Sequence, residues 1–283
     1  MRHAHTLLID FCACMLDDDL RYRAGLHAGL MMGAVIPLFG IDPYERELRL
    51  QGTGTLVAVR GGDFFLFTAG HVIDSFPDKL PIVTWVGGAI SPVMVDGPGF
   101  TSEPRRFGRS KDHIDLAFLR LNAQSVSGLT QAGAQFIDAS WFSLDHDSSD
   151  VYAVLGYPLA INEPDFEQSE DHPKITVLNA EPRVIWATAC DNTAYARVKR
   201  SPAHNVVVQR QPPRGRRPSE GMKNAQGMSG GPIFNFGPAA DVRRSVATIR
   251  LAGILTEYNP KTKHFIGANS TVMSDIFRRG ASS

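Results

Sequence analysis

Three short segments contain the residue types that could together catalyse a nucleophilic attack assisted by proton transfer. His71 directly follows an apolar run and a glycine, Asp115 opens a second apolar run, and Ser229 lies in a glycine-rich turn. A serine hydroxyl is a weak nucleophile that needs an adjacent base. An imidazole can take and return that proton near neutral pH, and a carboxylate can fix its tautomer. The three segments therefore predict nucleophilic catalysis by Ser229, with His71 as the base and Asp115 as its orienting partner.

The glycine-rich turn has a second predicted role. Glycines let the backbone of residues 226–232 turn sharply enough for two amide N–H groups to converge on one oxygen. The N–H groups of Gly227 and Ser229 would then form an oxyanion hole, in which losing one donor typically costs about 10²–10³ in rate.

Each segment also has an ordinary structural interpretation. A histidine after a strand is often a satisfied turn residue, an aspartate that opens a strand is often a turn residue, and a glycine-rich serine turn can be a simple bend. Asp112 is a rival to Asp115 for the third position.

A metal hydrolase is disfavoured, because the nine histidines are scattered without a His-Glu-x-x-His helix. We therefore expect neither a metal nor a cofactor.

The composition limits the class of protein. The chain has 283 residues, with 29 basic and 29 acidic residues, 43% hydrophobic and 20% charged. These values exclude global disorder and collagen-like repeats, and the balanced charge argues against a dedicated nucleic-acid binder. Three cysteines, Cys12, Cys14 and Cys190, are too few for a disulfide framework. A reducing compartment, and hence a cytoplasmic location, is favoured.

The amino-terminal segment is predicted to be helical. The apolar stretch 6–16 is interrupted by Asp10 and is followed by three aspartates, which disfavours a secretory signal. The run 24–41 is only mildly hydrophobic, so a packed amphipathic helix that opens near Asp19 is favoured over a membrane anchor. We expect residues 1–45 to form a helical extension.

The rest of the chain shows the pattern of an all-β protein. Short β-prone runs are separated by turn-forming residues, which indicates a sandwich or barrel rather than βαβ units. The predicted strands are 52–60, 64–68, 80–86, 116–121, 151–155, 175–178, 183–187, 205–209, 232–236, 247–256 and 264–268. The end of the chain, residues 270–279, is predicted to be a short amphipathic helix.

The motifs resemble those of the trypsin-like serine proteases, which have the chymotrypsin fold. Residues 68–71 (Thr-Ala-Gly-His), 115–117 (Asp-Leu-Ala) and 227–232 (Gly-x-Ser-Gly-Gly-Pro) match the family's three motifs, in the family's order. The resemblance implies two antiparallel six-stranded β-barrels, with the first over 46–145 and the second, plus the carboxyl-terminal helix, over 146–283. It also implies a serine endopeptidase that acts on protein or peptide substrates.

The resemblance further suggests where a substrate would bind. Thr256 and Tyr258 are the expected positions of backbone pairing with the substrate. Glu257 between them would suit a basic side chain, whereas Lys223 would suit an acidic one, and the sequence does not decide between them. Met228 replaces the aspartate of digestive members, which makes the chain more similar to bacterial or viral intracellular relatives.

Two proline- and arginine-rich segments, 96–112 and 210–224, are predicted to be exposed loops. Solvated loops are favoured over contacts with an acidic regulatory partner. No contact with nucleic acid or a membrane is predicted. The alternative to an enzyme is a protease-fold binding module whose triad is inactive or regulated by a partner.

Overall fold

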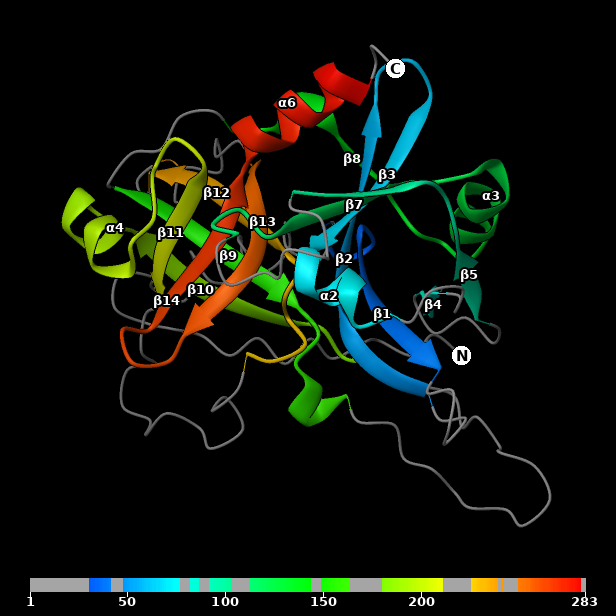
Figure 1. Cartoon of the computed structure of the whole chain (residues 1–283), viewed down its shortest axis with the longest axis horizontal. Helices are drawn as coiled ribbons and strands as arrows, with labels where there is room; N and C mark the ends of the chain where they lie inside the picture. The colour runs from blue at the N-terminus through cyan, green and yellow to red at the C-terminus, as the bar shows by residue number, and fades with distance from the viewer. Residues whose placement is uncertain are drawn as a thin grey trace.

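The computed structural model describes residues 31–41, 48–76, 82–86, 92–102, 112–143, 149–162, 180–210, 225–238, 241 and 249–280. Two β-structures lie side by side in it, an open sheet and a closed barrel, and α6 lies across the top of both (Figure 1). Within the described residues, every helix is too short or too polar to cross a lipid bilayer.

The first β-structure is built from the amino-terminal half of the described chain. Its strands are β1 (Val35–Ile41), β2 (Leu48–Val59), β3 (Asp63–Ala69), β4 (Ile82–Thr84), β5 (Val93–Val95), β6 (Gly99–Thr101), β7 (Leu116–Arg120) and β8 (Ile137–Asp138). They form a sheet in the order β5-β4-β1-β2-β3-β7-β6, and β8 pairs in parallel with β2. Three helical segments accompany it: α2 (Gly70–Asp74), α3 (Ala123–Gln131) and η2 (Ala139–Trp141).

The second β-structure is a closed six-stranded barrel in the order β10-β11-β14-β13-β12-β9. Its strands are β9 (Asp150–Gly156), β10 (Arg183–Ala189), β11 (Asn205–Arg210), β12 (Pro232–Pro238), β13 (Arg250–Asn259) and β14 (His264–Asn269). The short helices η3 (Leu159–Ile161) and α4 (Asn192–Val198) connect strands, and α6 (Ser270–Gly280) follows β14.

Two expectations from the sequence need correction. Residues 35–41, which were assigned to the helical extension, form β1, which pairs with β2 and β4. Pro37 disfavours a helix interior because it cannot donate the i→i−4 bond, and the neighbouring valine, isoleucine and phenylalanine favour a strand. The remainder of the expected extension, apart from 31–34, lies outside the described residues.

The second correction concerns the first barrel. It was expected to be closed and six-stranded, but it is an open eight-stranded sheet, a half-barrel with β5 and β6 at its ends. Within the described residues, the short β5, β6 and β8, of two or three residues each, extend this sheet without closing its hydrogen-bond ladder. The predicted all-β fold with a carboxyl-terminal helix is confirmed.

The core joins both halves of the molecule. One hydrophobic cluster contains buried side chains of the open sheet, such as Phe67, and of the barrel, such as Trp186. The helix α6 contributes Phe277, whose ring centroid lies 4.9 Å from that of Phe65 and 5.6 Å from that of Phe67. Aromatic contacts of this kind contribute beyond their buried area, so α6 fastens the open sheet to the barrel that precedes it.

Candidate active site

The pairing of β3 with β7 brings His71 and Asp115 together. In this antiparallel ladder Ala69 pairs with Leu116, so the residues just beyond the pair, Gly70 and Asp115, lie opposite each other. The Gly70 N–H donates to the Asp115 carbonyl at 2.7 Å. The Asp115 carboxylate then accepts from the His71 backbone N–H at 3.0 Å and lies 2.6 Å from the ring Nδ1. The sequence-predicted pair is therefore formed.

Asp112, the rival for the third position, has a different place. Its carboxylate accepts hydrogen bonds from the backbone N–H groups of Ile114 at 3.1 Å and Asp115 at 2.9 Å, and from the Ser102 hydroxyl at 2.6 Å. These bonds hold the turn in which Asp115 adopts a left-handed conformation, with φ of 48°. Such a conformation costs free energy for a residue with a side chain. Asp112 therefore supports the turn, and Asp115 is the partner of His71.

The turn that carries Ser229 is anchored in the barrel. Met228, the residue before it, is fully buried in the barrel's hydrophobic cluster. The Gly230 N–H donates to the Leu255 carbonyl at 2.7 Å, which ties the turn to β13. Burial of the Met228 side chain and the hydrogen bond of Gly230 thus hold this turn against the barrel.

Two threonines of β2 hold the same turn from the open sheet. The Thr53 hydroxyl donates to the Gly227 carbonyl at 2.7 Å, and the Thr55 hydroxyl donates to the Gly230 carbonyl at 2.9 Å. The Thr53 N–H donates to the Ser229 carbonyl at 2.8 Å. Because these threonines are fully buried, their hydroxyls need partners. Neither threonine belongs to a predicted site, although two threonines that are two residues apart on a strand share one face and so are a readable signal.

Carbonyl anchors also fix the two amides of the predicted oxyanion hole. The Gln226 carbonyl accepts from the Leu159 N–H at 2.7 Å, and the Met228 carbonyl accepts from the Gly231 N–H at 3.0 Å. The N–H of a trans peptide points opposite to its carbonyl. The N–H groups of Gly227 and Ser229 are therefore oriented, and among the described residues neither has a hydrogen-bond acceptor.

Glycine is required at two points of this turn. Gly227 and Gly230 have φ of 90° and 94°. A Cβ at Gly227 would lie 2.6 Å from the Tyr157 carbonyl oxygen, and one at Gly230 would lie 1.9 Å from the Thr53 carbonyl oxygen.

The nearby Tyr157 is itself buried, and its hydroxyl donates to the Val35 carbonyl at 3.1 Å. Burial raises the pKa of that hydroxyl well above its usual range.

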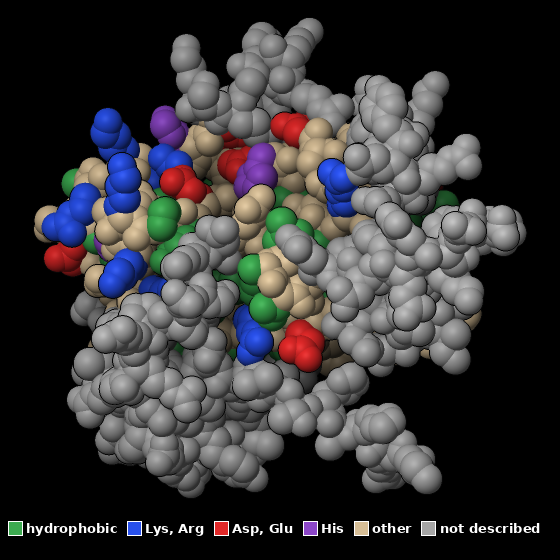
Figure 2. Space-filling view, turned by 90° about the horizontal axis from the view of Figure 1, so that it is seen from below, with side chains coloured by type: hydrophobic (Ala, Val, Ile, Leu, Met, Phe, Trp, Pro, Cys, Tyr) green, Lys and Arg blue, Asp and Glu red, His purple; other side chains and the backbone are tan. Residues whose placement is uncertain are grey.

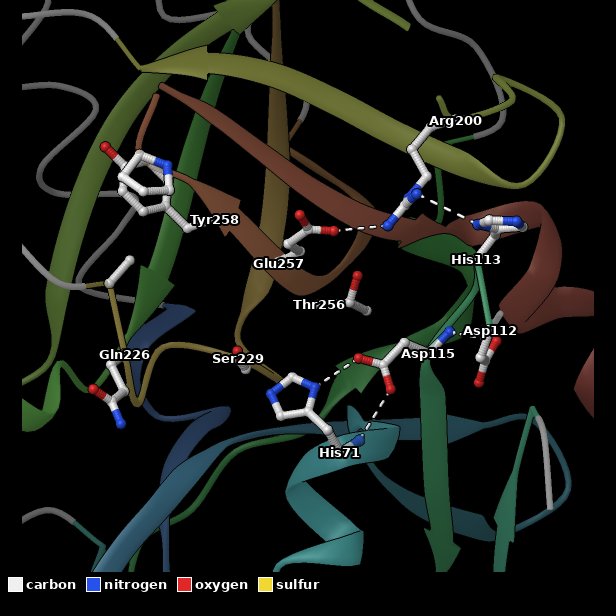
Figure 3. A pocket seen from close by; sticks show the side chains of 12 residues that line it. His71, Asp112, His113, Asp115, Arg200, Gln226, Ser229, Thr256, Glu257 and Tyr258 are labelled. Atoms are coloured by element: carbon white, nitrogen blue, oxygen red, sulfur yellow. Dashed lines mark hydrogen bonds and ion pairs between the residues drawn. The ribbon is translucent and has the colours of Figure 1, made fainter. Parts of the chain in front are cut away.

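The three predicted residues line one pocket of about 500 Å³ between the two halves. Figure 3 shows the His71 ring between Asp115 and Ser229. The His71 side chain is 48% exposed and that of Asp115 is 18% exposed, so the imidazole is accessible from the pocket. Within the described residues, however, the Ser229 hydroxyl makes no hydrogen bond to the imidazole. Such bonds are often long in the absence of a substrate.

The strand β13 presents an open edge to this pocket. Its pairing with β12 ends at Ile254, whereas its pairing with β14 continues to Asn259. Thr256 and Tyr258, the predicted pairing positions, line the pocket. Glu257 also lines it, but its carboxylate accepts from Arg200 at 2.7 Å, a partner that the sequence did not indicate. Lys223 lies outside the described residues, as do most residues of both predicted basic loops.

No metal centre is evident in the described part of the chain, where no three histidine, cysteine or acidic side chains cluster. The prediction that no cofactor is needed remains a prediction.

The fold and this site together define the class. A closed six-stranded barrel beside a curved half-barrel, with a pocket between them and a carboxyl-terminal helix, fits the chymotrypsin-like double-barrel fold.

No family model matches the chain, and no curated protein matches it. Among solved structures, the chain is similar to the active form of the Rv3671c protease from M. tuberculosis. That match has a TM-score of 0.43 and 13% sequence identity, and it covers 90% of this chain and 83% of the other.

Proposed function

We propose that the protein is a serine endopeptidase that hydrolyses peptide bonds through an acyl-enzyme intermediate. The observation that carries the proposal is the His71–Asp115 pair, 2.6 Å apart, in a pocket that Ser229 also lines. Asp115 fixes the Nδ1 side of the ring, so Nε2 is the nitrogen left to accept the serine proton.

The proposed chemistry has two stages. The imidazole takes the Ser229 proton as the hydroxyl oxygen attacks the substrate carbonyl, and the Gly227 and Ser229 amides bind the resulting oxyanion. As the C–N bond breaks, the imidazolium returns the proton to the leaving amine. In the second stage the same imidazole takes a proton from water as the water attacks the acyl ester. As the ester C–O bond breaks, the imidazolium returns that proton to the Ser229 oxygen, which regenerates the hydroxyl and releases the acid product.

The alternative is a binding module whose triad is inactive or switched on by a partner. The observation that favours it is that the Ser229 hydroxyl and the imidazole are not hydrogen-bonded in this structure. A catalytic site must form that bond before Ser229 can attack, whereas a binding module does not need it. The presence of all three side chain types in one pocket favours the enzyme.

Covalent labelling distinguishes the two functions. We expect a fluorophosphonate probe to label the purified protein, and labelling to be lost in Ser229→Ala and reduced by at least about 10³-fold in His71→Ala. Ser127→Ala, which removes an exposed hydroxyl from α3, is the matched control and should label like the original protein. Labelling that persists in Ser229→Ala would contradict the proposed nucleophile, and no labelling of the original protein would favour the binding module.

A further inference from the structure

Four exposed basic side chains gather at one end of the barrel. Arg197 lies in the last turn of α4 and Lys199 directly follows it, while Lys261 and Lys263 lie in the turn between β13 and β14. Figure 2 shows lysine and arginine side chains gathered over this side of the molecule, on the left. We call these four residues the basic rim.

The basic rim is an excess of positive charge within the described part of the chain. Among the described residues, each of its four side chains lacks an ion-pair partner, whereas Arg120 and Arg200 pair with Asp63 and Glu257 at 2.7 Å. The whole chain carries equal numbers of basic and acidic residues. The rim is therefore a local segregation of charge within a neutral protein, and surfaces of this kind attract ligands of opposite sign.

The two parts of the rim belong to one surface. The positive charge of Arg197 helps to lower the pKa of His264, which directly follows Lys263. The Lys263 carbonyl accepts from the Arg210 N–H at 3.0 Å, at the end of β11. The helix α4, which ends in Arg197 and Val198, packs over β11 and β14 through Tyr195.

The rim is also continuous with the pocket. Arg200 and Pro260 line the pocket, and each is the immediate neighbour of a rim residue, Lys199 and Lys261 respectively. The open edge of β13 runs from Thr256, near Ser229, towards Asn259 and the turn that carries the two rim lysines. A chain that pairs with this edge would therefore be directed from the nucleophile towards the rim.

We propose that the basic rim binds acidic side chains of the substrate, four to six residues on the amino-terminal side of the cleaved bond. The inference rests on the proposed function and names its substrate class, a peptide with an acidic segment upstream of the cut. Suppose that the residue just before the cleaved bond lies opposite Thr256. The third residue before that bond then lies opposite Tyr258, because paired strands advance together. At about 3.4 Å per residue, the next residues reach Pro260 and Lys261.

Glu257 does not oppose this preference. Its carboxylate is 44% exposed, but its charge is compensated by Arg200, which is only 19% exposed and is held within hydrogen-bond distance of that carboxylate. Among the described residues, the unpaired charge that an extended substrate meets between Thr256 and the basic rim is therefore positive. Glu257 alone would suggest a preference for a basic substrate side chain, but the charge of Arg200 compensates that of Glu257.

Three fluorogenic peptides test the inference on the full-length protein. They share one cleavable core and carry Asp-Glu-Asp, Asn-Gln-Asn or Lys-Lys-Lys at the fourth to sixth upstream positions. We expect kcat/KM for the acidic peptide to exceed that for the neutral one by about 10-fold at low salt, since two or three exposed ion pairs each add a modest factor. The advantage should largely disappear in 0.5 M NaCl.

Charge-removing variants locate the effect. Lys261→Gln combined with Lys263→Gln should reduce the acidic-to-neutral ratio to within about 2-fold of unity, while fluorophosphonate labelling is unchanged. The control, Arg49→Gln with Arg60→Gln, removes the same charge from exposed positions on the open sheet and should retain the ratio.

The outcomes separate this inference from the proposed function. Efficient cleavage of all three peptides at similar rates, or a preference for the lysine peptide, would overturn the inference and leave the peptidase intact. The inference also fails if an oligonucleotide of equal charge competes at the rim while the acidic peptide gains nothing over the neutral one. Absence of both labelling and cleavage would overturn the function, and the inference with it.

Discussion

The two β-structures of this protein solve the problem of sheet edges differently. The barrel closes its ladder on itself through six strands, whereas the open sheet ends in β5 and β6, strands of three residues. The barrel half supplies most of the residues that line the pocket, yet the open-sheet half carries the His71–Asp115 pair and also Thr53 and Thr55, which hold the turn of Ser229. Each half therefore contributes side chains to the pocket, and the open-sheet half also holds the turn of Ser229, which belongs to the barrel half.

The contact between β2 and the glycine-rich turn links the two halves through buried hydrogen bonds. Gly230→Ala should break it, because the new Cβ would lie 1.9 Å from the Thr53 carbonyl oxygen at a φ of 94°. We expect fluorophosphonate labelling to fall by more than about 100-fold and the free energy of unfolding to fall by about 3 kcal/mol or more. Labelling kinetics and urea denaturation measure the two effects.

Gly61→Ala is the matched control for this change. Gly61 also has a positive φ, 116°, but its added Cβ would meet no atom within 4 Å. It should therefore cost only backbone strain, about 1–2 kcal/mol, with labelling unchanged. Equal losses of labelling in both variants would refute the importance of the Thr53 contact.

A smaller change tests one hydroxyl of the open sheet. Thr53→Val removes the donor to the Gly227 carbonyl and the acceptor of the Tyr157 N–H at 2.9 Å. We expect kcat/KM to fall about 10- to 100-fold and the free energy of unfolding to fall by about 1–3 kcal/mol, since buried groups lose partners.

The control hydroxyl lies in the same sheet. Thr84 of β4 is buried, and its hydroxyl has no hydrogen-bond partner in the described structure. Thr84→Val should therefore leave activity unchanged and be neutral or stabilising by up to about 1 kcal/mol. If the two valine variants behave alike, the threonine contacts of β2 do not position Ser229.

The smallest expected effect concerns pH and the barrel alone. His264 is 2% exposed, and burial, with a smaller contribution from Arg197, lowers its pKa. Below about pH 6.5 the unfolded chain therefore takes up a proton at this residue that the folded chain resists, so stability falls as pH falls. The described histidines of the open sheet, His71 and His113, are exposed.

Replacing the histidine should sharpen this contrast between the halves. His264→Gln should lose part of the destabilisation between pH 7 and pH 5, by at most about 1.4 kcal/mol per pH unit. Thermal denaturation across that range measures it for both proteins, and carboxylates common to both cancel in the difference. Identical pH dependence in the two proteins would contradict the expected effect of His264.

Long, strongly patterned elements could be predicted from the sequence. The runs predicted at 64–68, 116–121 and 264–268 correspond closely to β3, β7 and β14, and the predicted helix 270–279 corresponds to α6. The motif residues could be predicted because sharp turns need glycine, and proton transfer needs a histidine and a carboxylate. Their shared pocket follows from these motifs together with the strand register.

The missed elements and contacts depend on tertiary structure. The helices α3 and α4 were not predicted. They begin at Asn122 and Asp191, whose side chains accept from backbone N–H groups at 2.8 and 2.9 Å. Asparagine and aspartate are common helix caps, so these two residues were readable signals in the sequence. The very short β5 and β8 contain too few residues to show a period. The pairing of Arg200 with Glu257 joins residues 57 apart, and no local pattern announces it.

The short link between β5 and β6 limits how far the open sheet can gape. These end strands are joined by residues 96–98 alone, so their adjoining ends lie no more than about 14 Å apart. At about 4.8 Å between neighbouring strands, such a gap admits at most two foreign strands. At the end of the sheet where β5 leads into β6, the described part of the sheet is therefore open by no more than the width of two added strands.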